Sequence, residues 1–144
     1  MTPGQSRPEL RQRIQRFIDA HICEPTLDAG ESAAALGISV RHLHRVFSLT
    51  GITLGDCIRS RRLEHCRNDL ASPHWRDRTV TEIAFCWGFN DSAHFSHRFR
   101  REFGVSPRTF RAKSVFRTQN RAGEERASDD NYEELSELRC FRPN

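Results

Sequence analysis

The sequence predicts an all-α protein of about seven helices, in which two helix-turn-helix subdomains flank a long linker helix and a disordered acidic tail follows. Three observations support this fold class. Apolar residues recur every three or four positions through most of residues 8–113. Glycines and capping residues divide these stretches at helical lengths. Two stretches roughly fifty residues apart repeat one order: helix, glycine, cap, helix.

The length and charge of the chain limit the number of domains and the kind of partner. The 144 residues allow one ordinary domain or two very small ones. Residues 1–113 hold 18 lysines and arginines against 12 acids, whereas residues 114–144 hold 5 against 7. A basic body with a pI near 9.1 favours a polyanionic partner. Lys113 is the sole lysine; arginine suits phosphate and guanine, although biased genome composition would produce the same usage.

Several site classes find no support in the residue pattern. The five cysteines are odd in number and contain no C-x-x-C, so neither a disulfide framework nor a zinc finger is expected. His94 and His97 share a helical face, but no third metal ligand is evident. No apolar run could span a bilayer, and the first ten residues lack the core of a signal peptide. We therefore expect no cofactor, no metal, no membrane contact and a cytoplasmic, nucleoid-associated location.

The first predicted helix covers residues 8–22, where Pro8 suits the first turn. Its apolar stripe comprises Leu10, Ile14, Phe17, Ile18 and Ile22. Thr26 or Asp28 caps a second helix, which ends at Gly37.

Ser39 is the predicted cap of a third helix, which buries Leu43 and Phe47 and ends at Gly51. The linker helix is expected from Thr53 to Leu70, within a linker region of residues 53–72. Four arginines decorate this helix: Arg59, Arg61, Arg62 and Arg67. Two alternatives stay open for them, because each can contact phosphate or pair at the surface with Glu64 and Asp69.

A polar loop over residues 71–78 precedes the second subdomain, and its Trp75 is expected to fold onto the body. A short helix from Thr79 runs to Gly88-Phe89, and Asn90 or Asp91 caps the next helix. That helix places Phe95, Phe99 and Phe103 four residues apart and ends at Gly104. A last short helix follows Ser106-Pro107 through Ala112. Residues 114–144 are expected to be disordered, with a frayed helix over 132–138.

The outer faces of the two second helices carry the functional information. Opposite the phenylalanine stripe lie Ala93, His94, His97, Arg100 and Arg101, with Arg98 on the flank. In the first subdomain, the corresponding face presents Arg41, Arg45 and Ser48, with His42 and His44 at its edges. Neither face contains a carboxylate. Such faces offer donors to phosphate and guanine, whereas the simpler interpretation is a solvated surface helix.

These residues resemble the AraC/XylS family of bacterial transcriptional regulators over roughly residues 10–113. In the second subdomain the likeness rests on Ile83-Ala84, Gly88-Phe89, Ser92, Phe95-Ser96, Phe99, Phe103-Gly104, Ser106-Pro107 and Phe110-Arg111. In the first subdomain and the linker it rests on Gly37, Ser39, Leu43, Arg45, Phe47, Gly51, Ile58, Arg62, Leu63 and Leu70. The resemblance implies a DNA-binding domain over residues 8–113, with subdomains at 8–52 and 79–113.

By position, the resemblance implies base contacts from Arg41, His44, Arg45, Ala93, His94 and His97. It implies backbone contacts from Ser39, Arg62, Ser92, Arg98, Arg100 and Arg101. The two recognition helices would enter successive major grooves of double-stranded DNA, one helical turn of ~34 Å apart. A sequence-specific transcription regulator follows, an activator by family habit, with RNA polymerase as a further partner.

The sequence also bears on two other function classes. A non-catalytic protein-interaction module, or a truncated regulator that has lost its effector domain, would explain the acidic tail and the few residues before the first motif helix. No effector ligand is expected within this chain. An enzyme is not expected, because the sequence shows no nucleophile with a placed base, no paired carboxylates and no phosphate loop.

Overall fold

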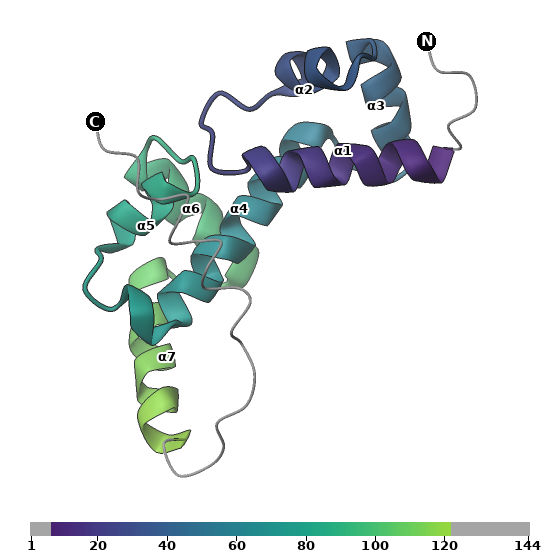
Figure 1. The fold of residues 1–144 in the computed structure, drawn as a ribbon. Coiled ribbons are helices and arrows are strands. Elements are labelled where there is room, and N and C mark those ends of the chain that lie inside the picture. The colour runs from purple at the N-terminus through teal and green to yellow at the C-terminus, as the bar shows by residue number, and fades with distance from the viewer. Residues whose placement is uncertain (1–6, 122–144) are drawn as a thin grey trace. The chain divides into compact units, whose positions relative to one another are not determined.

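The computed structural model describes residues 7–121, and every regular element in this range is a helix, which confirms the predicted all-α class (Figure 1). The elements are α1 (Arg7–His21), α2 (Ala29–Leu36), α3 (Val40–Ser48), α4 (Leu54–Ala71), the 3-10 helix η1 (Pro73–Trp75), α5 (Val80–Cys86), α6 (Ser92–Phe103) and α7 (Pro107–Arg121). Two compact units result: unit 1 is Met1–Arg62 and unit 2 is Leu63–Asn144. The boundary falls inside α4, and each unit is described by itself.

Unit 1 is built on the apolar stripe of α1, as its periodicity predicts. Ile14, Ile18 and Ile22 are at most 1% exposed, and Leu43 of α3 is fully buried with them. α2 contacts both α1 and α3, and Ala33 provides its small buried surface. Burial of each large aliphatic side chain contributes ~1.5–3 kcal/mol, so the stripe stabilises this unit.

The caps in unit 1 resolve one open alternative. Asp28, and not Thr26, caps α2, since Asp28 Oδ1 accepts the Glu31 backbone N–H at 2.8 Å. Thr26 instead lies 3.4 Å from the Glu31 carboxylate, to which its hydroxyl donates. Gly37 closes α2 with φ of 68°, a left-handed conformation that other residues rarely adopt. This turn leads directly into α3.

Unit 2 is held together by aromatic side chains. Phe95 and Phe99 are fully buried, with ring centroids 5.7 Å apart. The Phe99 ring also contacts Phe103 of the same helix, at 4.6 Å between centroids, and Phe110 of α7, at 5.7 Å, so that Phe110 joins α7 to α6. The Arg67 guanidinium of α4 lies 5.2 Å from the Phe103 ring centroid, a cation–π contact. The predicted phenylalanine stripe is thus the core of this unit.

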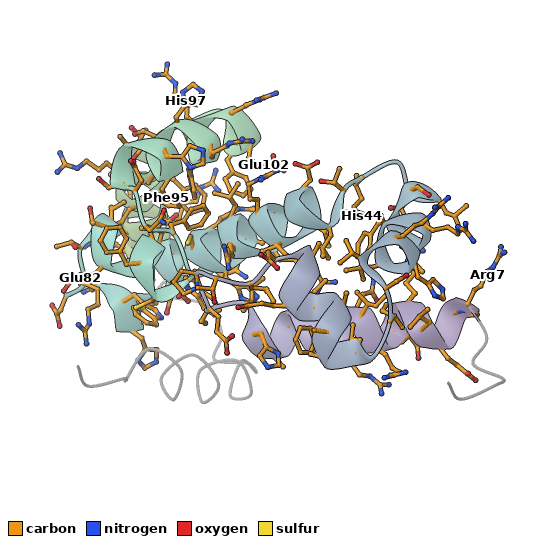
Figure 2. All side chains as sticks on the ribbon, turned by 90° about the horizontal axis from the view of Figure 1, so that it is seen from above. Arg7, His44, Glu82, Phe95, His97 and Glu102 are labelled. Carbon is orange, nitrogen blue, oxygen red and sulfur yellow. The ribbon has the colours of Figure 1, made fainter. Side chains whose placement is uncertain are left out.

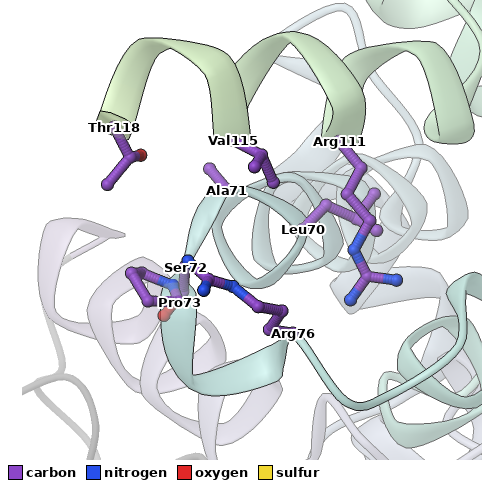
Figure 3. A pocket seen from close by; sticks show the side chains of 8 residues that line it. All are labelled: Leu70, Ala71, Ser72, Pro73, Arg76, Arg111, Val115 and Thr118. Carbon is purple, nitrogen blue, oxygen red and sulfur yellow. The ribbon is translucent and has the colours of Figure 1, made fainter. Parts of the chain in front are cut away.

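The predicted end of the last helix near Ala112 is wrong, because α7 continues to Arg121. The added turns are supported from two sides. Ser114 and Thr118 donate their hydroxyls to the carbonyls of Phe110 and Ser114, at 2.9 Å and 3.0 Å. Val115 lines a pocket of about 20 Å³ with Leu70, large enough for one water molecule (Figure 3).

The loop before unit 2's first helix pair folds onto α7. Trp75 is half-buried, as expected, and its carbonyl accepts a hydrogen bond from the Arg111 guanidinium. The disordered tail is predicted from residue 114, which is wrong for residues 114–121 because they lie in α7. The rest of the predicted tail, including the frayed helix over 132–138, lies outside the described residues. No helix between Arg7 and Arg121 is long and apolar enough to cross a membrane.

Candidate nucleic-acid interface

The outer face of α3 is defined by the N-cap at which the helix begins and by the side chains that the helix buries. Ser39 Oγ accepts the His42 backbone N–H at 3.0 Å. Leu43 is fully buried and Phe47 is 7% exposed, so their positions define the inner face of the helix. Val46 is half-buried beside them, and the exposed side chains are Val40, Arg41, His42, His44, Arg45 and Ser48. The face predicted from helical spacing is therefore the solvent face.

Two cations on this face have no internal partner. Within residues 7–121, no carboxylate or carbonyl pairs with the Arg41 or Arg45 guanidinium. Two other arginines of unit 1 do pair with acids: Arg59 with Asp56, and Arg61 with Asp19. Arg41 and Arg45 therefore keep their donors available for a ligand, and guanidinium donors suit phosphate and guanine edges.

The outer face of α6 is organised in the same way. Asp91, and not Asn90, is the N-cap, because Asp91 Oδ1 accepts the His94 backbone N–H at 2.7 Å. Phe95 and Phe99 bury the inner face. Figure 2 shows His97 projecting away from unit 2 while Phe95 of the same helix points inward. The exposed side chains on this helix include Ser92, Ala93, His94, His97, Arg100 and Arg101.

Arg98 and Glu102 complete the surface of α6. Arg98 is half-buried, and its Nε donates to Nε2 of His94 across 3.4 Å. That contact requires the neutral acceptor nitrogen of His94 to be Nε2, which leaves Nδ1 as its donor. Glu102 is exposed and is the one carboxylate of the helix. It lies in the last turn, whereas the imidazoles lie in the first half.

Arg62 corrects the predicted set of phosphate contacts. Its side chain is 8% exposed, and its Nε donates to the Ile22 carbonyl at 2.9 Å. A second guanidinium nitrogen donates to the Glu24 carbonyl. The carbonyls at and beyond a helix C-terminus lack helical partners, so Arg62 satisfies acceptors that α1 leaves open. The guanidinium that the sequence placed on DNA instead joins α4 to the end of α1.

The linker arginines were expected either to contact phosphate or to pair at the surface with Glu64 and Asp69, and Asp69 does not form such a pair. Arg67 does pair with Glu64, at 3.4 Å, but Asp69 is 5% exposed and forms no surface pair. Its carboxylate accepts the Trp87 indole N–H at 2.5 Å. His65 stacks on Trp87 with ring centroids 4.1 Å apart. The sequence analysis missed this cluster, although Asp69 lies three residues after Cys66 on the apolar face of α4, a spacing that could have revealed it.

Comparisons with known proteins bear on both helix pairs together. A family model described as a helix-turn-helix domain matches residues 32–113. The transcriptional activator NphR of Rhodococcus sp is 35% identical over 105 residues, which covers 73% of this chain and 30% of NphR. A solved transcriptional regulator with an AraC-type DNA-binding domain, from Chromobacterium violaceum, superposes with a TM-score of 0.68 at 27% identity, covering 75% of this chain and 94% of that one.

The chain belongs to the AraC/XylS family. This confirms the resemblance seen in the sequence, and the matched residues form an AraC/XylS DNA-binding domain. The members of this family are transcription regulators and not enzymes. The HTH-type transcriptional activator RhaS of Klebsiella pneumoniae is 45% identical over 82 residues, covering 56% of this chain and 28% of RhaS. This chain spans about a third of the length of the curated relatives it matches.

Proposed function

We propose that this protein binds double-stranded DNA at a specific sequence and activates transcription. One observation carries the proposal: α3 and α6 each bury an apolar face and expose a face of arginine and histidine donors. The family supports DNA binding by this domain. The relatives NphR and RhaS are named as transcriptional activators, which supports the direction of regulation.

We assign base contacts to the exposed residues of the two helices. In α3 these are Arg41, His44 and Arg45, whose donors fit the acceptor edge of guanine. In α6 they are Ala93, His94 and His97, where the Ala93 methyl suits contact with a thymine methyl. The two helices would read successive major grooves, one turn or ~34 Å apart on the duplex. Residues 8–52 and 79–113 are the proposed reading subdomains, with residues 53–72 as the linker.

Backbone contacts hold these helices in register on the duplex. We assign them to side chains beside the base contacts, namely the exposed Ser39, Ser92, Arg100 and Arg101 and the half-buried Arg98. The N-termini of α3 and α6 add unpaired backbone N–H groups that favour phosphate. Arg62 is left out, because its donors are used inside unit 1. An activator acts at the chromosome, so we place the protein in the cytoplasm with the nucleoid, in contact with RNA polymerase.

Selection from a random duplex pool, followed by sequencing of the retained fragments, tests the proposal. We expect a bipartite site whose two halves lie one helical turn apart. Binding should fall steeply with salt, because phosphate neutralisation releases counterions. A chain that retains no duplex at low ionic strength would instead fit the protein-interaction module as its function.

A further inference from the structure

The outer face of α7 presents an apolar side chain among cations. Phe116 is 66% exposed, well above the usual exposure of a phenylalanine. Ala112, Lys113 and Arg117 lie around it and line the same open surface hollow. We name these four residues the α7 patch. Phe116 and Arg117 lie beyond residue 113, where the match to the helix-turn-helix family model ends.

All charged side chains of α7 are positive. The helix contains no carboxylate and five cations: Arg108, Arg111, Lys113, Arg117 and Arg121. Lys113 and Arg117 are four residues apart, a spacing at which like charges destabilise a helix. Because Arg111 donates to the Trp75 carbonyl, it is held on the inner side of α7. The outer face therefore favours a partner that is both acidic and apolar.

The chain itself contains such a segment. Residues 122–144 hold seven carboxylates against three arginines. Within them, residues 129–138 contain no cation and interleave three apolar side chains with five carboxylates. The apolar residues are Tyr132, Leu135 and Leu138, and the acids are Asp129, Asp130, Glu133, Glu134 and Glu137. We name residues 129–138 the acidic segment.

We propose that the acidic segment docks on the α7 patch of the same chain, with its apolar side chains on Phe116 and its carboxylates near Lys113 and Arg117. Seven residues, 122–128, separate the end of α7 from the segment and reach ~25 Å when extended. Phe116 lies ~7.5 Å back along the helix from Arg121, so this reach is ample. Such a short tether gives an effective concentration of about millimolar, which favours contact within one chain over contact between chains.

Docking has a consequence for the cations of the patch. While the segment is bound, Lys113 and Arg117 face carboxylates and cannot neutralise phosphate. The acidic segment and the added turns of α7 both lie outside residues 32–113, the range that the family model matches.

Backbone NMR relaxation of the full chain, without DNA, tests the contact. We expect amide order parameters of residues 132–138 above ~0.6 in the parent protein and below that value in Phe116→Ser. Phe85→Ser is the matched control, since Phe85 is also an exposed phenylalanine, at 48%, but lies on α5. This control should leave the order parameters of residues 132–138 unchanged.

A second variant examines the contact from the other side. Leu135→Ser leaves residues 7–121 intact and should shift the amide resonances of Lys113, Phe116 and Arg117 in the same direction as 1 M salt does. Low order parameters at residues 132–138 in the parent protein would overturn the proposal. So would equal effects of Phe116→Ser and Phe85→Ser, or an ordered segment that loosens on dilution, which would indicate contact between copies. None of these readouts depends on DNA binding.

Discussion

The Trp87 indole N–H donates to the Asp69 carboxylate across 2.5 Å, with both side chains buried in unit 2. Burial raises the pKa of Asp69 to about 6, although the hydrogen bond from Trp87 favours the charged form and opposes the shift. The ordinary pKa of this carboxyl is 3.8. Asp69 of α4 and Trp87 at the end of α5 thus meet at a carboxyl group whose pKa lies above the range in which most carboxyl groups ionise.

This shift predicts a pH dependence of stability. Between pH 4 and 6 the folded state binds more protons at Asp69 than the unfolded state does, so stability falls as pH rises through 6. The contribution is fully present below pH ~4, and its loss as pH rises through 6 amounts to about 3 kcal/mol. Urea unfolding of the parent and Asp69→Asn between pH 4 and 7.5 measures it. The difference between the two should change over this window; parallel curves would contradict the assignment.

Arg62 is predicted to act on stability and not on DNA. Arg62→Ala leaves the Ile22 carbonyl without its donor, whereas the Glu24 carbonyl still accepts the Leu27 backbone N–H, and the change should cost about 1–3 kcal/mol in urea unfolding. The exposed Arg16→Ala, on α1, is the control and should stay within about 0.5 kcal/mol. The salt slope of DNA binding should not change in Arg62→Ala. A reduced slope with unchanged stability would restore the phosphate contact.

Arg45 is predicted to read a base. Arg45→Ala removes an exposed guanidinium that has no partner within residues 7–121. It should cost about 1–3 kcal/mol at one base step and relax specificity there. A randomised-site binding assay of the parent and Arg45→Ala measures both quantities, with Arg16→Ala as the control. Equal losses on all sequences would reassign Arg45 to the DNA backbone.

Arg101 is predicted to contact phosphate. It is exposed near the end of α6, and Arg101→Ala should weaken binding to every duplex alike. Plots of log affinity against log salt should flatten by about 0.9, the contribution of one phosphate contact. A change confined to one base position would show that Arg101 reads sequence.

Ser39 allows the cap of α3 to be separated from DNA contact. Ser39→Asp keeps an N-cap acceptor for the His42 N–H, so thermal stability should change little. The added negative charge should repel a nearby phosphate and weaken binding to all sequences. Thr79→Asp is the matched control, because Thr79 caps α5 and has no proposed DNA contact. If both variants bind DNA equally well, Ser39 lies away from the phosphates.

Much of the fold follows from local rules. The first helix, predicted over 8–22, is observed at Arg7–His21, and the linker helix predicted from Thr53 to Leu70 is observed at Leu54–Ala71. Amphipathic spacing determines these elements, since an apolar stripe must be buried on one face. Caps are less certain from sequence: Thr26 and Asn90 were open alternatives, and hydrogen-bond geometry selects Asp28 and Asp91.

By itself, the sequence determined the helices, the aromatic core of the second subdomain and the outward faces of α3 and α6, because each depends on spacing within one segment. Tertiary structure alone decided the roles of Arg62 and Asp69 and the length of α7. Arg62 meets carbonyls 38 and 40 residues away, and Asp69 meets an indole 18 residues away. Helical periodicity shows which side of a helix is buried, but a polar group on that side is assigned only when its distant partner is known.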